Sequence, residues 1–263
     1  MSTRFRQCEL DLDHPLPGSL QQGHTERESM QRKITRRILA VVASATAILA
    51  SQATVAPAHA IVGGAWAGKT RHTVQVDVVK LDGTRTRCSG ILVDDSWVLT
   101  AAHCLWATEP SKVTVHVGSL QLDAGYRRGL KGYTGWTKAD VALMELDAPV
   151  PLGWAPFPAA DHYVDTGTNL AASGWGQTAS GQWPTRLAVC TVRVGRYLEN
   201  NEHIVHMDVA RGDGIQSYGD SGGPIVDAAG VPHAMTITGD NSTTARAVSL
   251  ADSDLQQWIV SKI

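Results

Sequence analysis

The sequence predicts an all-β fold that ends in a short C-terminal α-helix, and three observations support this. Short β-branched runs alternate with Gly, Asp and Pro turns through most of the chain after residue 60, which is typical of a sandwich or barrel. The chain has no internal repeats. Helical segments do not alternate with the strands, as a parallel sheet with crossover helices would require.

The elements follow from local periodicity. Four apolar runs bounded by turn residues predict strands at Thr73–Val79, Gly90–Ala101, Lys112–Gly118 and Leu187–Val194. A helix is expected after Asp252 and Ser253, because Leu255, Trp258 and Ile259 then fall on one face.

Residues 30–60 carry the pattern of a secretory signal peptide. A basic segment, residues 32–37, precedes an apolar run, and Ala58-His59-Ala60 fits an A-x-A cleavage site. A rival cut after Ala53 would leave a propeptide that ends at Ala60. The apolar run is short and contains Ser and Thr, which disfavours a retained membrane anchor. We therefore expect a secreted, extracellular protein.

The residues before the signal pattern are polar and show no apolar period. Residues 1–29 are either a disordered extension or a stretch upstream of a true start at Met30. Neither interpretation gives them a role in the folded protein, so residues 1–60 are expected to be removed.

Charge excludes two classes of partner. Residues 61–263 contain 16 Lys and Arg against 20 Asp and Glu, a net charge of −4. This composition and the absence of a basic stripe argue against binding to nucleic acid or an anionic membrane. The histidines show no metal-ligand spacing with acids or cysteines. We expect a monomer with no metal and no cofactor.

Three cysteines follow residue 60. Cys88 and Cys104 bracket two β-rich runs that a hairpin would bring side by side, so a disulfide is expected between them outside the cell. Cys190 is then unpaired, and we interpret it as a small buried apolar residue; the alternative is an intermolecular disulfide.

The segment SYGDSGGPIV, Ser217–Val226, places Ser221 between glycines. Gly219–Gly223 matches G-x-S-x-G, the nucleophile elbow of α/β-hydrolases. In that fold the histidine follows the serine. Here the only later histidine is His233, and no acid lies in the required place between them. The order of residues and the β-rich pattern therefore both argue against the elbow.

A different triad is available upstream. A serine hydroxyl needs a base to take its proton, and the base needs a carboxylate to orient it. His103 lies in LTAAHC at the end of an apolar strand. Asp140 begins the apolar strand in ADVALMEL, where a carboxylate is costly unless paired. The candidate catalytic residues are therefore His103, Asp140 and Ser221.

Five motifs together resemble the chymotrypsin-like (trypsin-like, S1-type) serine endopeptidases, particularly small secreted bacterial members. In chain order they are IVGG at Ile61, LTAAHC around His103, DVALMEL at Asp140, SGWG at Ser173–Gly176 and GDSGGP around Ser221.

The resemblance implies two six-stranded antiparallel barrels with the triad in the cleft between them. The first would comprise residues 61–165 and carry His103 and Asp140. The second would comprise residues 166–250 and carry Ser221, followed by the helix in residues 251–263. It also implies an acyl-enzyme, an oxyanion hole formed by the N–H groups of Gly219 and Ser221, and polypeptide substrates. Protein protease inhibitors are possible partners.

The chain departs from trypsin-like members at the specificity pocket. Ile215 replaces the aspartate six residues before the nucleophile, which argues against cleavage after Arg or Lys. Matching HAMTITGD to the substrate-binding strand places Thr236 and Thr238 beside the P1 residue, with Ala247 opposite. A shallow apolar pocket for Ala, Val or Leu is expected.

Two changes of register remain open at this pocket. A slip of one residue puts Gly239 in place of Thr238 and admits Phe or Tyr. A different loop register would let Asp213 enter the pocket.

The resemblance also supplies a partner for Asp220, which lies in a segment too apolar to leave a carboxylate unpaired. The α-amine of Ile61, released by cleavage after Ala60, would form an ion pair with it and set the oxyanion-hole loop. Signal cleavage would then itself activate the enzyme.

Two other functions remain open. One is a catalytically silent homologue that binds a partner through the cleft. The other is a secreted esterase that acts on small acyl esters.

Overall fold

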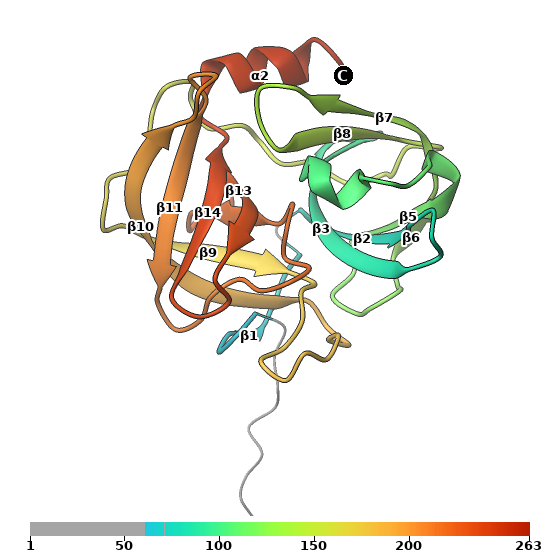
Figure 1. Ribbon diagram of the computed structural model, residues 1–263, viewed down its shortest axis with the longest axis horizontal. Coiled ribbons are helices and arrows are strands. Elements are labelled where there is room, and N and C mark those ends of the chain that lie inside the picture. Colours follow the sequence, from blue (N-terminus) through green and yellow to red (C-terminus); the bar gives the residue numbers. More distant parts are fainter. Residues whose placement is uncertain (1–60, 71) are drawn as a thin grey trace, which may run out of the picture. The chain divides into compact units, whose positions relative to one another are not determined.

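The computed structural model describes residues 61–70 and 72–263, which belong to one structural unit, Pro57–Ile263 (Figure 1). The expected signal peptide, both of its cleavage sites and the N-terminal extension lie outside the described residues. None of the helices in the described ranges is long and apolar enough to cross a membrane.

The first sheet has seven antiparallel strands in the order β6-β5-β2-β3-β4-β8-β7. Its edge strands β6 and β7 are separated in sequence only by Gly129, so one bent segment supplies both edges. If the bent segment is counted as one strand, the sheet has the six strands expected. The strands are β2 (Thr73–Val79), β3 (Arg85–Asp94), β4 (Trp97–Thr100), β5 (Val113–Val117), β6 (Tyr126–Arg128), β7 (Leu130–Trp136) and β8 (Val141–Leu146).

The second sheet also has seven strands, in the order β1-β10-β11-β14-β13-β12-β9, and an additional β9–β10 pairing closes it into a barrel. Six strands form the closed barrel, and the two-residue β1 is added at β10. The strands are β1 (Ala65–Trp66), β9 (Asn169–Gly174), β10 (Ala188–Glu199), β11 (Val205–Arg211), β12 (Pro224–Val226), β13 (Pro232–Gly239) and β14 (Thr244–Ser249).

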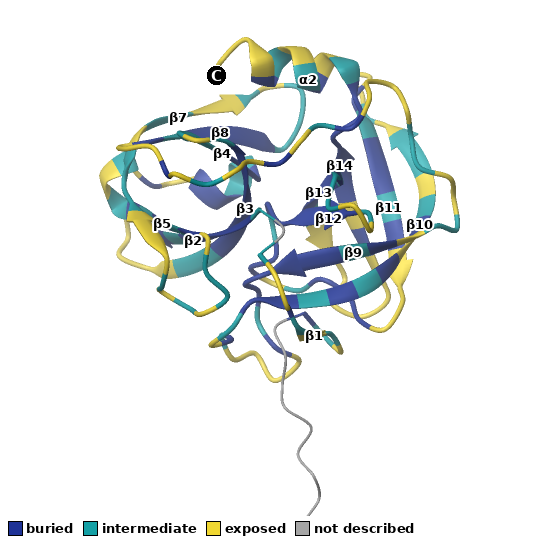
Figure 2. Ribbon diagram, turned by 180° about the vertical axis from the view of Figure 1, so that it is seen from behind, coloured by how far each residue is buried: buried dark blue, intermediate teal, exposed yellow. Residues whose placement is uncertain are grey.

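Burial follows the strand pattern, with dark-blue buried residues inside both sheets (Figure 2). Along β5 the buried residues Val113, Val115 and Val117 alternate with half-buried ones, as one inward face requires. The core of the first sheet extends into the second half of the chain through Met235 and Val248. The all-β double-barrel fold with one short C-terminal helix is therefore confirmed.

Helix α2 (Ser253–Val260) begins where the sequence predicts. The Asp252 carboxylate accepts a hydrogen bond from the Leu255 N–H at 2.9 Å, which satisfies one of the free amides of the first turn. Leu255 and Ile259 are buried. Trp258 stacks on Trp136 of β7 with ring centroids 5.5 Å apart, so the helix packs against the first sheet.

Cys88 of β3 and Cys104 form the expected disulfide, and Cys190 is free and buried, also as expected. The bridge spans a sequence separation of 16. A loop of this length is worth about 3 kcal/mol of unfolding free energy. Urea titration of the Cys88→Ala/Cys104→Ala double variant should therefore give a stability lower by that amount. Unchanged stability would contradict a structural role for the bridge.

Candidate active site

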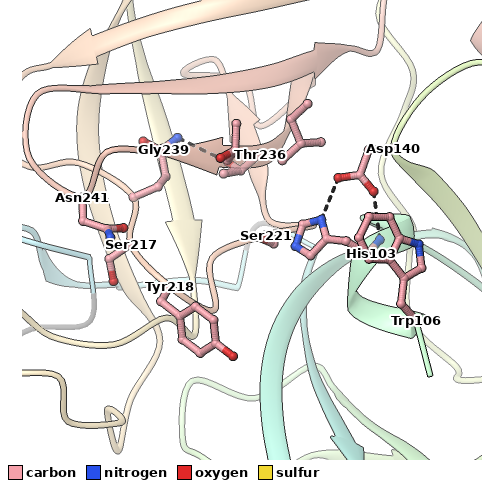
Figure 3. Close-up of a pocket in the computed structure, with 12 residues that line it drawn as sticks. His103, Trp106, Asp140, Ser217, Tyr218, Ser221, Thr236, Gly239 and Asn241 are labelled. Atoms are coloured by element: carbon pink, nitrogen blue, oxygen red, sulfur yellow. Dashed lines mark hydrogen bonds and ion pairs between the residues drawn. The ribbon is translucent and has the colours of Figure 1, made fainter. Parts of the chain in front are cut away.

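A cavity of about 470 Å³ opens where the two sheets meet (Figure 3). The first half of the chain contributes three of its lining residues, and the second half contributes the loop before β12 and the end of β13. The lining residues are His103, Trp106, Asp140, Gln216, Ser217, Tyr218, Ser221, Thr236, Ile237, Thr238, Gly239 and Asn241. All three candidate triad residues thus line one cavity.

Asp140 holds His103 at two points. Its Oδ2 is 2.6 Å from the ring nitrogen Nδ1, and its Oδ1 accepts a hydrogen bond from the His103 backbone N–H at 2.8 Å. His103 lies in a 3₁₀ helix, Ala102–Leu105, directly after β4, while Asp140 immediately precedes β8, the neighbour of β4. With Nδ1–H donated to the carboxylate, Nε2 is left as an acceptor.

Ser221 lies on the other side of the His103 ring from Asp140 (Figure 3). Its hydroxyl makes no hydrogen bond within the described part of the chain. The Asp220 N–H is already donated to the Ser217 carbonyl at 3.0 Å. In contrast, the N–H groups of Gly219 and Ser221 have no acceptor among the described residues. Gly219 has φ +98°, a conformation that glycine adopts without strain.

Ser89 of β3 fixes the nucleophile loop from the opposite barrel. Its N–H donates to the Ser221 carbonyl at 2.8 Å, and its hydroxyl donates to the Gly219 carbonyl at 3.1 Å. Ser89 is fully buried. These two bonds orient the 219–220 and 221–222 peptide planes, which flank the 220–221 peptide that carries the Ser221 N–H. Sequence reasoning missed this residue, because nothing in its neighbourhood except the adjacent Cys88 indicates a long-range role.

Asp220 is fully buried, and burial raises the pKa of its carboxyl to about 7, although hydrogen bonds from the Ser217 and Gly176 N–H groups oppose that rise. Both bonds are 2.8 Å long. A Cβ on Gly176 would lie 2.5 Å from the Asp220 carboxyl carbon. This contact explains the glycine of SGWG. No ion pair to Asp220 occurs among the described residues.

Ile61 is fully buried in the core of the second barrel, and the next residue, Val62, exchanges two backbone hydrogen bonds with Ile215. The nitrogen of Ile61 is an amide in this continuous chain, and no bond joins it to Asp220. Ile61 has φ +67°, which is strained for a β-branched residue. The expected ion pair stays a prediction.

The predicted pocket residues separate into two groups. Thr236 and Thr238 line the cavity, and so does Gly239, the alternative of the one-residue slip. Ile215 and Ala247 do not line it. Both are fully buried, Ile215 beside Val62 and Ala247 opposite Thr236 in the β13–β14 pair.

Asp213 does not enter the pocket. Its carboxylate accepts hydrogen bonds from the Thr191 N–H at 2.6 Å and the Thr191 hydroxyl at 3.1 Å. The alternative loop register is therefore not adopted, and Asp140 is the only acidic residue among the described residues that line the cavity.

Several lining residues were not predicted. Gln216 is only 2% exposed, and its amide nitrogen donates to the Thr236 hydroxyl at 3.2 Å, whereas its carbonyl oxygen has no partner within the described residues. Trp106 is 67% exposed, and its ring forms a T-shaped pair with the His103 ring, with centroids 6.1 Å apart. Tyr218 flanks the nucleophile loop. An aromatic residue near a motif is a weak sequence signal, because its direction depends on the tertiary fold.

The double β-barrel brings a serine, a histidine and an aspartate to one cavity, the set of side chains that serine hydrolases use. Residues 61–259 match the model of the Trypsin family. The chain belongs to the trypsin family.

Curated relatives are consistent with this membership. The chain is 33% identical over 132 residues to serine protease SP24D of Anopheles gambiae, covering 46% of this chain and 48% of the relative. It is 29% identical over 182 residues to human kallikrein-11, covering 59% and 63%. The chain thus spans between about half and two thirds of these relatives. They are insect and human proteins, so a bacterial origin stays a prediction.

Solved structures share the fold at low identity. One titled "Structure of GrC" has a TM-score of 0.66 at 20% identity, covering 77% of this chain and 99% of that one. The scabies mite inactivated protease paralogue S-D1 also has a TM-score of 0.66 at 20% identity, covering 76% and 97%. Because an inactivated paralogue has the same fold, the fold alone does not decide whether this chain is active.

Proposed function

We propose that the chain is a secreted serine endopeptidase that hydrolyses peptide bonds through His103, Asp140 and Ser221. The observation that carries the proposal is the pair of hydrogen bonds from His103 to Asp140, with Ser221 beside the same ring in one cavity. The disulfide and the trypsin-family membership support an extracellular location, where such bridges persist.

The proposed chemistry follows from this geometry. Ser221 attacks the scissile carbonyl while His103 Nε2 accepts its proton, and Asp140 stabilises the imidazolium that forms. His103 then protonates the leaving amine, which leaves an acyl-enzyme on Ser221. Water repeats the sequence with His103 as base, and the acid product departs.

The developing oxyanion needs donors that are not already in use. The Gly219 and Ser221 N–H groups meet this condition. Ser89 donates hydrogen bonds to the carbonyls of the same two residues and so fixes the loop. Removing one donor of this kind typically costs about 2.7 to 4 kcal/mol of transition-state stabilisation.

We propose a small or medium apolar side chain at P1. The walls beside Ser221 are the uncharged side chains of Gln216, Ser217, Thr236 and Thr238, so an Arg or Lys would lose its hydration without gaining a counter-ion. The buried Gln216 amide adds one polar group to this surface. The branched, exposed side chain of Thr238 narrows the entrance.

Thr238→Gly should shift this preference. Removal of the branched side chain leaves room for an aromatic ring, so the ratio of kcat/KM for Phe over Ala at P1 should rise by about tenfold or more. The control is Thr243→Gly, in the exposed turn before β14. An unchanged ratio would contradict a pocket bounded by Thr238.

Activation by a free Ile61 amine belongs to the same proposal. The strain at Ile61 supports it, because a first residue has no preceding carbonyl and therefore no such φ restriction. The Asp220 carboxylate is buried and forms no ion pair among the described residues, so it is the group with which the amine would form an ion pair. N-terminal sequencing of the secreted protein distinguishes a start at Ile61 from one at Thr54.

Peptide and ester turnover separate this function from its rivals. The chain beginning at Ile61 should cleave a peptide library internally, and the Ser221→Ala variant should not. Turnover of small acyl esters with no peptide cleavage would indicate an esterase. Binding of polypeptides with no turnover of either class would indicate a silent homologue.

A further inference from the structure

A second cavity, of about 460 Å³, lies next to the active site and contains three arginines. Its walls come from β2, β3, β5, β6, the turn at Asp123 and the segment around Trp183. We propose that it binds an acidic side chain of the polypeptide substrate, on the leaving-group side of the cleaved bond. This inference rests on the proposed endopeptidase function and specifies the class of substrate.

Tyr218 connects the two cavities. It lines the active-site cavity, its hydroxyl lies 2.8 Å from the Thr86 hydroxyl, and its ring centroid lies 6.0 Å from that of Trp183. Thr86 and Trp183 both line the second cavity. Figure 3 shows Tyr218 and Thr236 on opposite sides of Ser221. With the acyl part of a substrate beside Thr236, its leaving part therefore extends past Tyr218.

Strand β3 sets the distance between the nucleophile loop and the arginines of the second cavity. Ser89, which bonds to the Ser221 carbonyl, shares one face of the strand with Arg87 and Arg85, because side chains alternate. At roughly 3.3 Å per residue, these arginines lie about 7 and 13 Å along the strand from Ser89. An extended substrate advances at a similar rate. The second to fourth residues after the cleaved bond therefore reach the cavity.

The arginines retain capacity for an anion. Arg87 donates to Asp77 through Nε at 2.8 Å and stacks over Trp183 at 5.1 Å, but its Nη1 is buried with no acceptor in the described structure. Arg85 and Arg127 are exposed at the cavity, and neither forms a described ion pair.

Two aspartates in the cavity offset part of this charge. The carboxylates of Asp77 and Asp123 both accept hydrogen bonds from the amide of Gln75, which is fully buried. Asp77 is partly buried and Asp123 is exposed, so the three arginines leave one net positive charge at the cavity. His116 comes within 4.8 Å of both carboxylates, a convergence that sequence spacing did not reveal. Burial lowers its pKa, so it adds no positive charge at neutral pH.

The proposal can be tested with quenched peptides that share the same P1 residue. Each carries either Glu or Gln at the second, third or fourth position after the cleaved bond. At one of these positions the wild type should cleave the Glu peptide with a kcat/KM about fivefold higher, the size of a partly exposed charge pair. Higher salt should reduce this preference. In the Arg85→Gln/Arg127→Gln variant the Glu/Gln ratio should fall to about one.

The matched control is Arg193→Gln/Lys262→Gln, which removes two positive charges from the second barrel and the C-terminal end and should retain the preference. Equal cleavage of Glu and Gln peptides by the wild type would overturn the acidic subsite and leave the endopeptidase function standing. So would a preference that persists in the Arg85→Gln/Arg127→Gln variant. Titration of Ser221→Ala with the same peptides tests the subsite without turnover, and equal affinities for Glu and Gln peptides would overturn it.

Discussion

Ser221→Ala and His103→Ala should each lower kcat for peptide cleavage by about a factor of 10⁶, and Asp140→Asn by about 10⁴. The first two remove the nucleophile and the base outright. Asparagine has nearly the same shape as Asp140, but an amide N–H can replace the Oδ2 that lies 2.6 Å from His103 Nδ1. That amide donates to Nδ1 and so favours the wrong histidine tautomer. Initial rates over a range of substrate concentrations measure these losses.

The non-additivity of these losses tests whether the three residues act together. The Ser221→Ala/His103→Ala double variant should be no slower than Ser221→Ala by more than a few fold, because either change alone removes the same proton transfer. His233→Ala, at the histidine after the serine, is the matched control and should retain activity. Multiplicative losses in the double variant would contradict a triad.

Asp220 should make the stability of the uncleaved chain fall as pH rises from about 4 to about 7. Its pKa is about 7 in the folded chain against about 3.9 unfolded. The folded state therefore binds the extra proton between these values, and unfolding becomes easier as pH increases. The expected loss is on the order of 4 kcal/mol. Urea titrations of the Ser221→Ala chain, which cannot digest itself, measure it.

The chain that begins at Ile61 should instead lose stability at a higher, alkaline pH. Pairing with Asp220 raises the pKa of the amine above its usual value of about 7.7 to 8.0. The stability from this pair is full below that range and is lost as pH rises through the raised pKa. Asp220→Asn should remove this loss of stability between about pH 4 and 7 from the uncleaved chain. In the chain starting at Ile61 it should abolish nearly all activity, and full activity there would rule out the ion pair.

Much of the fold was predictable because the relevant signals are local. The alternation in β5, the cap at Asp252 and the two cysteines that flank β4 all depend on neighbours along the chain. The spacing of the His, Asp and Ser motifs in turn indicated the family, to which the whole segment 61–259 was then matched.

The specificity pocket was less predictable because it depends on contacts between distant segments. Ile215 was expected to line it, but Val62 pairs with Ile215 and holds it in the core, and the next residue, Gln216, lines the cavity instead. Ser89 and the arginines of the second cavity were missed for the same reason. Their partners lie on other strands, and no local pattern identifies them.

Fluorophosphonate labelling followed by peptide mapping tests the triad most directly, because the reagent reacts with an activated serine and requires no knowledge of the substrate. The chain that begins at Ile61 should take up one adduct, on Ser221, and its labelling rate should fall by several orders of magnitude in His103→Ala. Absence of an adduct on the folded wild type, or an adduct on a different serine, would contradict the proposed function.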